Sequence, residues 1–365
     1  MTMASFTYNA LPGRVVFGAG TFEHVPDEID RLGARRILLI ADRSGRSWAE
    51  QLIARLGDRI VGRISEVRPH VPIDDAEAAR RLAEQGDADS VITVGGGSST
   101  GLGKAVALER PIPILAIPTT YAGSEMTPIW GLTRGARKET GRDPSVQPRT
   151  VVYDPRLTLS LPPEISGPSG MNALAHCVEA LYAEGANPIT SLMAEQGILV
   201  LARGLPRVVA EPADLDGRTE VLAGAYLAGA AFAVAGSGIH HKICHVLGGA
   251  YDLPHAEMHT VVLPHALAYV APFQPEAIGR MAAALGEADV PGAIFDLARR
   301  IGAPAGLAEI GMPRDRLDEA ASLIAEASVG TAVEISEANA RDVLDHAFAG
   351  RRPTSRRVSA PAITA

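Results

Sequence analysis

The sequence has few of the features that mark secreted, membrane-bound or nucleic-acid-binding proteins. Only two of its 365 residues are cysteines, so a disulfide framework is excluded and a reducing, cytoplasmic setting is expected. No run of five like charges occurs and the net charge is -8, which argues against a nucleic-acid or anionic-membrane surface. The N-terminus has neither the basic nor the apolar region of a signal peptide, so export is not expected.

Long apolar runs are also scarce. The segment VLAGAYLAGAAFAVAGSGI, residues 221–239, carries no charge and approaches the length of a membrane span. It is rich in alanine and glycine, lacks basic flanks and runs into a polar cluster of histidine and lysine. These features predict a buried core helix and not a transmembrane helix.

The chain is long enough for two domains. Residues 1–160 alternate short β-branched runs with amphipathic stretches, which predicts an α/β domain with a mostly parallel sheet. Residues 161–352 have long periods rich in Ala, Leu and Glu, which predict an all-helical domain, and 353–365 are expected to form a flexible tail. Strands are predicted at 36–41, 58–64, 90–94, 113–117 and 150–153, a helix at 74–85, and breaks between later helices at 204–207, 211–217, 252–255, 290–292 and 311–316.

The segment SVITVGGGSSTGLGKAVAL carries the sharpest chemical signal of the first domain. A buried strand runs into Gly95, Gly96 and Gly97, and Ser98 then opens a helix. Backbone amides at such a helix start are unobstructed and favour phosphate binding. The spacing matches neither G-x-G-x-x-G nor the P-loop, and a tight strand-to-helix turn is the alternative interpretation.

Two further segments follow predicted strands. Asp42 ends the strand at 36–41, where a carboxylate can bind the adenosine ribose and repel a 2'-phosphate, which favours NADH while NADPH stays possible. A solvated turn aspartate is the alternative. In PTTYAGSE, Thr119 and Thr120 reach the same sheet edge, where ligands bind in open α/β sheets, and we place them near the nicotinamide. The alternative there is a turn with a helix cap.

Four of the ten histidines lie between residues 237 and 255. His241 and His245 are four residues apart, as are Asn172 and His176, so each pair projects from one face of a helix. A lone histidine is usually a satisfied core or surface residue. Several that converge from separate segments are costly to bury without a function.

Two of these histidines need separate treatment. His240 and His241 are neighbours in sequence and point about 100° apart on a helix, so at most one of them is expected at a common focus. We choose His241. His255 follows a proline and is expected in a turn.

Taken together, GGGSS, PTTYAGSE, GMNALAHCVEALYA and HHKICHVLGGAYDLPH resemble the group III, iron-containing alcohol dehydrogenase superfamily, in the same order and along nearly the whole chain. The resemblance implies a dehydroquinate synthase-like architecture. This consists of an N-terminal nucleotide-binding α/β domain, an all-α C-terminal domain and an active site in the cleft between them, usually in a homodimer. One departure is Gly101, which replaces the acid of the family's GGGSxxD, and another is a threonine-rich loop one residue shorter than PTTxGTGSE.

The resemblance also implies a metal site that has lost its charge. In the superfamily one aspartate and three histidines hold a divalent metal, and these positions fall on Asn172, His176, His241 and His255. Because the amide is neutral, the ligand set lacks the anionic charge that helps retain Fe(II) or Zn(II). We therefore expect these positions to be vestigial, no metal requirement, and a more positive pocket that suits a small dianionic substrate.

Within the superfamily, the opening FTYNALPGRVVFGAG and the residues Tyr121 and Asn172 most resemble enzymes that reduce the conjugated C=C bond of maleylacetate to 3-oxoadipate in the degradation of aromatic compounds. The resemblance implies NADH or NADPH as the reductant. The predicted catalytic residues are His241 and His245 first, then His176 and His255, and the predicted substrate-binding residues are Asn172, Tyr121 and Lys242.

Three matters stay open at this point. The proton donor is one of the histidines, Tyr121, Lys242 or water. A metal-dependent alcohol or polyol dehydrogenase that keeps its ion is the alternative enzyme. A nucleotide-binding protein without catalysis is the alternative from another class.

Overall fold

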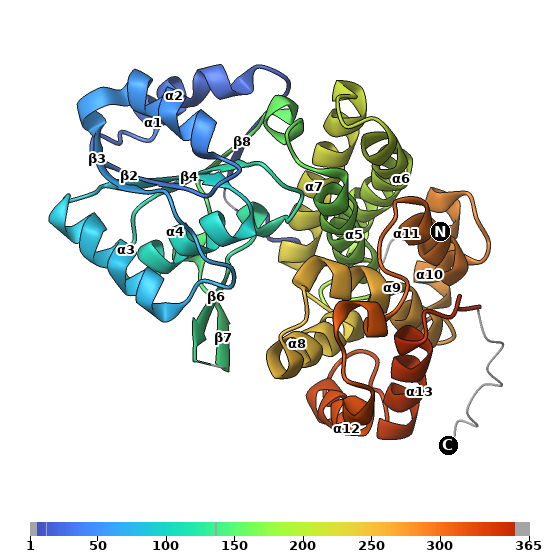
Figure 1. Cartoon of the computed structure of the whole chain (residues 1–365). Helices are drawn as coiled ribbons and strands as arrows, with labels where there is room; N and C mark the ends of the chain where they lie inside the picture. The colour runs from blue at the N-terminus through green and yellow to red at the C-terminus, as the bar shows by residue number, and fades with distance from the viewer. Residues whose placement is uncertain (1–5, 12, 136, 355–365) are drawn as a thin grey trace.

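A computed structural model describes residues 6–11, 13–135 and 137–354, so the predicted flexible tail lies outside the described residues apart from 353 and 354. Figure 1 shows a sheet with helices on both faces in the N-terminal part and a group of helices beside it in the C-terminal part. This is the α/β plus all-α architecture that the sequence predicts.

The N-terminal part is built on one parallel sheet with the strand order β1-β8-β5-β4-β2-β3. Its strands are β1 (Arg14–Phe17), β2 (Ile37–Ala41), β3 (Ile60–Ile64), β4 (Ser90–Gly95), β5 (Ile114–Pro118) and β8 (Thr150–Tyr153). All five predicted strands are confirmed, and β1 is additional. Every residue of β2, β4 and β5 is buried, as expected for central strands of a parallel sheet covered on both faces.

Helices cover the two faces of this sheet (Figure 1). The N-terminal helices are α1 (Val25–Arg31), α2 (Arg46–Leu56), α3 (Ile73–Gln85) and α4 (Gly97–Glu109). Along β2, Ile37 and Leu39 pack with α1 and α2, whereas Leu38 and Ile40 pack with α3 and α4. This alternation has the two-residue period of a strand, so successive side chains of β2 pack against the helices of opposite faces.

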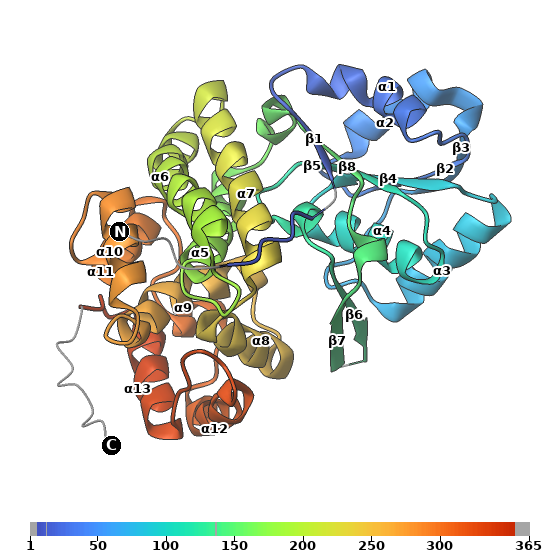
Figure 2. The ribbon, with the colours of Figure 1, turned by 180° about the vertical axis from the view of Figure 1, so that it is seen from behind.

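A two-stranded hairpin of β6 (Ile129–Arg134) and β7 (Arg137–Arg142) was not predicted. It projects from the α/β part on the side of α8 in both views (Figures 1 and 2). Within it, a Cβ on Gly141 would lie 2.5 Å from the ring of Trp130, so glycine lets the indole cross the facing strand. The hairpin forms one wall of the cavity described below.

The C-terminal part is helical, with α5 at its centre. The helices are α5 (Pro163–Ala180), α6 (Pro188–Ala210), α7 (Leu215–Ala235), α8 (Ile239–Tyr251), α9 (His255–Val270), α10 (Pro275–Leu285), α11 (Val290–Arg300), α12 (Leu317–Ser328) and α13 (Glu337–Phe348).

Short 3-10 turns occur in both parts of the described chain. They are η1 (Thr21–His24), η2 (Gly57–Arg59), η3 (Ser124–Met126), η4 (Pro144–Val146), η5 (Pro155–Thr158), η6 (Leu307–Ile310) and η7 (Arg314–Arg316).

Two predicted breaks are wrong. Residues 290–292 form the first turn of α11, and the break lies before them, at 286–289. Residues 204–207 lie inside α6, which runs through Pro206. A Cβ on Gly204 would lie 2.8 Å from the Val221 side chain of α7, so this glycine lets α7 pack closely against α6. Tertiary packing here outweighs the local preference of glycine and proline to end a helix.

The uncharged segment 221–239 forms most of α7, and much of it is buried. Among the described residues, no single helix is long and apolar enough to cross a membrane. Length and composition would allow it only for α7 and α8 taken together, and these two helices are bent by 98° at their junction.

The two parts share one hydrophobic core. Ala116, Tyr121, Val151 and Tyr153 from the α/β part are buried in the same cluster as the apolar residues of α5 to α9. Burial of apolar area at such a boundary is worth roughly 25 cal/mol per Å². The sheet edge and the central helices are therefore held in a fixed relation, and the site lies at this boundary.

Candidate active site

The glycine-rich loop joins β4 to α4 as predicted. Gly95 has φ +152°, and a Cβ there would overlap the Asp42 carboxylate, so only glycine fits. The helix begins at Gly97, one residue earlier than predicted, and its N-cap residue, Gly96, makes no side-chain cap hydrogen bond. The first N–H groups of α4 are thus left for a ligand, and the helix dipole favours an anion there.

Asp42 follows β2 as predicted, and its carboxylate accepts five hydrogen bonds from the protein. Oδ1 accepts from the N–H and hydroxyl of Ser44 and from the N–H of Gly45. Oδ2 accepts from the N–H of Gly96 at 2.7 Å and from the hydroxyl of Ser99 at 2.8 Å. The carboxylate therefore ties the end of β2 to the glycine-rich loop, a role that the sequence did not suggest. A ribose hydroxyl would have to replace one of these donors, and the ribose contact stays a prediction.

Thr119 and Thr120 lie at the predicted sheet edge but have different surroundings. Thr119 is buried, and its hydroxyl lies 2.6 Å from the Ser44 hydroxyl. Thr120 is half-buried, and its methyl group would lie 3.2 Å from a Cβ on Gly96. Thr120 is therefore the member of the pair whose side chain faces the glycine-rich loop.

Tyr121 does not occupy the predicted position in a substrate site. Its side chain is fully buried in the core shared by the two parts. Its hydroxyl accepts a hydrogen bond of 3.0 Å from the Arg218 guanidinium, which also donates to the Ser166 hydroxyl at 2.7 Å. Burial raises the pKa of Tyr121. We correct the prediction: Tyr121 anchors its loop to the helical part.

A cluster of histidines forms where α5, α8 and α9 meet. His176 on α5 stacks on His241 of α8, with ring centroids 5.2 Å apart. Asn172 lies one turn before His176, and both are buried. His245 lies one turn after His241, with ring centroids 5.9 Å apart. Nδ1 of His241 is hydrogen-bonded to Glu179, so Nε2 is the ring nitrogen that is left for a ligand.

The expectation that only one of His240 and His241 joins the cluster is wrong. Nε2 of His240 lies 3.0 Å from Nδ1 of His259, and the ring centroids of His240 and His259 lie 5.3 and 4.8 Å from that of His241. The side chains do diverge on α8, but α9 packs against α8 and brings His259 to meet His240. The spacing of four residues between His255 and His259 was a signal that could have found this residue.

Glu179 was also missed, although it follows His176 by three residues on the same helix. Burial by itself would raise the pKa of this carboxyl, but the charge and hydrogen bond of His241 outweigh burial and lower the pKa. A buried carboxylate therefore sits beside the cluster and offsets the more positive pocket that the sequence suggested. A carboxylate on the far nitrogen of an imidazole also fixes the tautomer and orientation of the ring.

Three buried imidazoles of the cluster, those of His176, His240 and His259, are neutral. Burial, opposed only in part by Glu179, lowers the pKa of His240 to about 3. Burial and then the neighbouring histidines lower the pKa values of His176 and His259 well below the ordinary range. Each of these rings therefore offers one N–H donor and one acceptor nitrogen at neutral pH.

Several polar atoms of the cluster lack a partner. Oδ1 of Asn172, Nδ1 of His176 and Nε2 of His259 are buried with no hydrogen bond among the described residues, and such atoms are costly unless a ligand completes them. The group whose ligand atoms all lie within 4.8 Å of one another is His240, His241 and His259. Of the four positions expected from the resemblance, this group contains His241.

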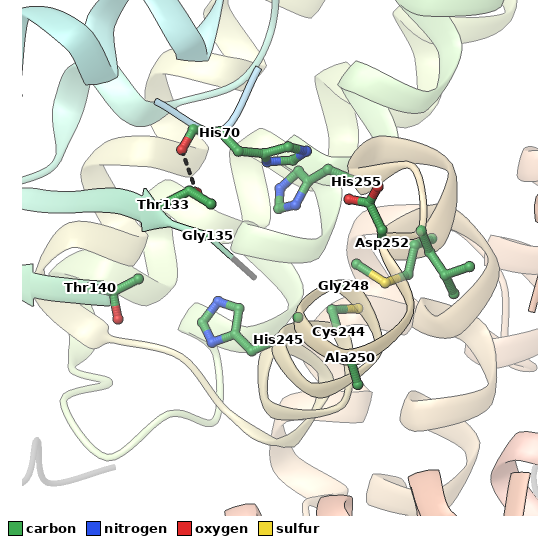
Figure 3. A pocket seen from close by; sticks show the side chains of 13 residues that line it. His70, Thr133, Gly135, Thr140, Cys244, His245, Gly248, Ala250, Asp252 and His255 are labelled. Carbon is green, nitrogen blue, oxygen red and sulfur yellow. Dashed lines mark hydrogen bonds between the residues drawn. The ribbon is translucent and has the colours of Figure 1, made fainter. Parts of the chain in front are cut away.

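A cavity of about 680 Å³ lies between the β6–β7 hairpin and helices α8 and α9 (Figure 3). His245 and His255 line it, facing Thr133 and Thr140 of the hairpin. His255 was expected in a turn and is the first residue of α9. Lys242, predicted to bind substrate, is not among the described residues that line the cavity.

His70 reaches this cavity from the loop between β3 and α3 and was not predicted. His70 and Val71 have φ values of 63° and 49°, in a region that few residues other than glycine adopt and that is an outlier for a β-branched residue. Each such residue costs about 1–3 kcal/mol. Thr133 holds this corner, since its hydroxyl donates to the His70 carbonyl at 2.7 Å and its N–H donates to the Val71 carbonyl at 3.0 Å.

Comparison with known proteins assigns the class. A family model for iron-containing alcohol dehydrogenase matches residues 12–155, and a model for the C-terminal part of the Fe-containing alcohol dehydrogenase family matches residues 167–347. The chain belongs to the iron-containing alcohol dehydrogenase family.

Within this family, the chain is similar to maleylacetate reductases. The chain is 47% identical to maleylacetate reductase 1 of Cupriavidus pinatubonensis, over 96% of this chain and 99% of the relative. It is 48% identical to maleylacetate reductase of Burkholderia cepacia, over 96% and 100% of the two chains. The crystal structure of maleylacetate reductase from Agrobacterium tumefaciens superposes with a TM-score of 0.92 at 44% identity, covering 96% of this chain and all of that one.

Proposed function

We propose that the chain is a maleylacetate reductase, which uses a nicotinamide cofactor to reduce the conjugated C=C bond of maleylacetate and forms 3-oxoadipate. The observation that carries the proposal is the identity of 47–48% to maleylacetate reductases over nearly the whole chain. The histidine cluster and the adjoining cavity supply imidazole hydrogen-bond donors of the kind that this substrate needs.

The cofactor fits the edge of the sheet. The uncapped N–H groups at the start of α4 suit the pyrophosphate, and Thr120 lies beside them on the neighbouring strand end. When bound, the nicotinamide supplies the hydride. We propose that NADH is preferred over NADPH, because the Asp42 carboxylate beside this loop would repel a 2'-phosphate.

The chemistry requires stabilisation of an enolate. Hydride delivered to the alkene carbon remote from the ketone moves charge onto the ketone oxygen, and a proton must then reach the adjacent carbon. Imidazolium or neutral imidazole N–H groups can hold such an oxygen, and a preorganised donor of this kind is worth about 2.7–4 kcal/mol. His241 is the leading candidate because Glu179 orients its ring through Nδ1, and Nε2, directed away from the carboxylate, donates to the oxygen when the ring carries both protons. His176, His245 and His255 are the remaining predicted catalytic residues.

We further propose that this reaction needs no metal, because the enolate can be stabilised by the imidazoles and Asn172 contributes no ligand charge. One observation favours a second candidate, a metal-dependent alcohol dehydrogenase. The ligand atoms of His240, His241 and His259 lie close enough to one another to hold an ion.

One experiment separates these functions. Purified protein is mixed with NADH or NADPH and a panel of maleylacetate, simple alcohols and aldehydes, and the metal content of the same sample is quantified before and after chelation. Metal-independent turnover of maleylacetate, faster with NADH, is expected. Loss of that activity on chelation and its return with Fe(II) or Zn(II) would refute the metal-free mechanism, and cofactor binding without any turnover would refute the enzyme assignment.

A further inference from the structure

We propose that His70 binds one carboxylate of the substrate and selects for a dicarboxylate, and that Val71, Thr133 and Gly101 serve to present it. This inference rests on the proposed function, because maleylacetate is the dicarboxylate in question. It concerns a residue of the α/β part, whereas the histidine cluster belongs entirely to the helices.

The lining of the cavity offers hydrogen-bond donors to an anion. Three imidazoles reach it from three separate elements: His70 from the loop before α3, His245 from α8 and His255 from α9. Asp252 is the one acidic residue among the described lining residues, and no lysine or arginine is among them. Imidazole N–H groups and threonine hydroxyls are therefore the side-chain donors that a carboxylate would meet here.

The imidazoles lie at two opposite sides of the cavity. In Figure 3 the rings of His70 and His255 lie beside each other at one side of the cavity, and His245 lies across from them. Maleylacetate carries a carboxylate at each end of a six-carbon chain. His70 comes from the α/β part and His255 from the helical part. The two rings can hold the same terminal carboxylate only when these parts keep their relative position.

The backbone at His70 is strained in a way that indicates function. Two consecutive residues without glycine, His70 and Val71, adopt left-handed φ values, and such outliers persist where the surroundings over-determine them, often at ligand sites. Thr133 fixes both carbonyls of the corner, at 2.7 and 3.0 Å. The hairpin thus holds the His70 backbone in the conformation that directs its ring to the cavity.

Gly101 leaves space for the Val71 side chain beside His70. It lies on α4, and a Cβ there would be 2.8 Å from Cγ2 of Val71, a separation that real side chains do not tolerate. Val71 is buried, so it cannot move outward without losing its packing. The glycine that replaces the acid of GGGSxxD therefore makes room for Val71, and through Val71 it supports His70.

Two substitutions of His70 test its role in binding. Asparagine tolerates left-handed backbone, so His70→Asn removes the imidazole while keeping the corner. At saturating NADH, the KM for maleylacetate should rise about tenfold or more with a much smaller change in kcat. The preference for maleylacetate over a monoester with one carboxylate should fall by a similar factor. His70→Gly should relieve the strain and raise the Tm, yet lose the same affinity.

Further variants test the positioning residues. Gly101→Ala and Thr133→Val should raise the same KM by roughly threefold, since they displace the ring without removing it. His24→Asn on the surface and Gly279→Ala, where a Cβ meets nothing within 4 Å, are matched controls that should change neither KM nor preference.

Three results would overturn the proposal. An unchanged KM in both His70 variants would remove His70 from substrate binding. Equal weakening of diacid and monoester would remove its role in selection. A KM unaffected by Gly101→Ala and Thr133→Val would remove the positioning role. A wild-type protein that does not reduce maleylacetate but reduces alcohols or aldehydes would instead refute the proposed function, which is a distinguishable outcome.

Discussion

The glycine-rich edge of the sheet and the histidine cluster face the same boundary, but they differ in how far the protein satisfies its own polar groups. At the sheet edge, Asp42 accepts five hydrogen bonds and the hydroxyls of Ser44 and Thr119 bond each other. In the cluster, polar atoms of Asn172 and His176 are buried without a partner among the described residues. The side chains of the loop are therefore paired within the protein, and the N–H groups at the start of α4 are left for a ligand. In the cluster, by contrast, the side chains themselves are completed by what they bind.

This contrast predicts where a single polar change costs most activity. In the cluster, the ionised Glu179 holds the His241 ring, so Glu179→Gln should lower kcat for maleylacetate by about 10–100-fold, as for other partners that orient a functional imidazole. Steady-state kinetics at saturating NADH measures this effect.

The control for this variant is Tyr182→Phe. The Tyr182 hydroxyl donates to Glu179 at 3.1 Å, so the variant removes a bond to the carboxylate without touching His241. It should leave kcat nearly unchanged. Equal losses in the two variants would show that Glu179 matters for local packing and not for the orientation of His241.

In the glycine-rich loop, the backbone conformation is expected to affect NADH binding and stability more than any one hydrogen bond does. Gly95→Ala would force a Cβ onto the Asp42 carboxylate at a φ that alanine resists, so the KM for NADH should rise about tenfold and stability should fall by about 1–3 kcal/mol. Gly97→Ala places a Cβ at an ordinary contact distance of 3.4 Å from Ala122 and should change both far less. NADH titration and urea unfolding of the two variants test the comparison, which fails if they behave alike.

Because the cluster contains buried polar atoms without a partner among the described residues, an added negative charge should change how well it retains a metal ion. Asn172→Asp adds an anionic ligand beside His176 and should tighten retention of Zn(II) or Fe(II) about tenfold, or ~1.4 kcal/mol. Metal content after dialysis against graded chelator is the measurement. Asn339→Asp, on the exposed side of α13, adds the same charge far from the cluster and should have no effect. Unchanged retention in Asn172→Asp would refute the argument that a lost ligand charge explains the site.

Much of the fold could be predicted because local and tertiary preferences agree. The buried β-branched runs of β2, β4 and β5 form strands in any plausible sheet, and the onset of the helical part follows the change in periodicity. The β6–β7 hairpin was missed because β7, RKETGR, is polar and gives no apolar alternation. The break expected at 204–207 failed because close packing of α6 and α7 is a tertiary effect.

The site was predictable only where spacing along one helix determines proximity. Asn172 with His176 and His241 with His245 follow from the i, i+4 rule. Which ring His259 meets depends on how α9 crosses α8, and the direction of Tyr121 depends on the buried Arg218. The left-handed backbone of His70 is imposed by Thr133, 63 residues away in sequence. No local sequence pattern therefore predicts this conformation.

A buried histidine outside the cluster separates the cost of burial from function. His265 on α9 is 3% exposed, and neither of its ring nitrogens has a hydrogen bond among the described residues. Burial, and then the charge of His346, lowers its pKa to about 4. The unfolded chain, with a histidine pKa near 6.5, therefore binds more protons between these two values, so stability is lost as the pH falls from about 6.5 toward 4.

His265→Leu should remove this loss, because leucine fills the site without a titratable group. Between pH 7.5 and 5.5 the wild type should lose about 1 kcal/mol more than the variant in urea unfolding, while kcat at pH 7.5 should not change. Parallel stability profiles would mean that His265 is solvated in the folded state. A fall in kcat would mean that its imidazole contributes to the site, and burial of a neutral ring would then not distinguish the histidines of the cluster from those of the core.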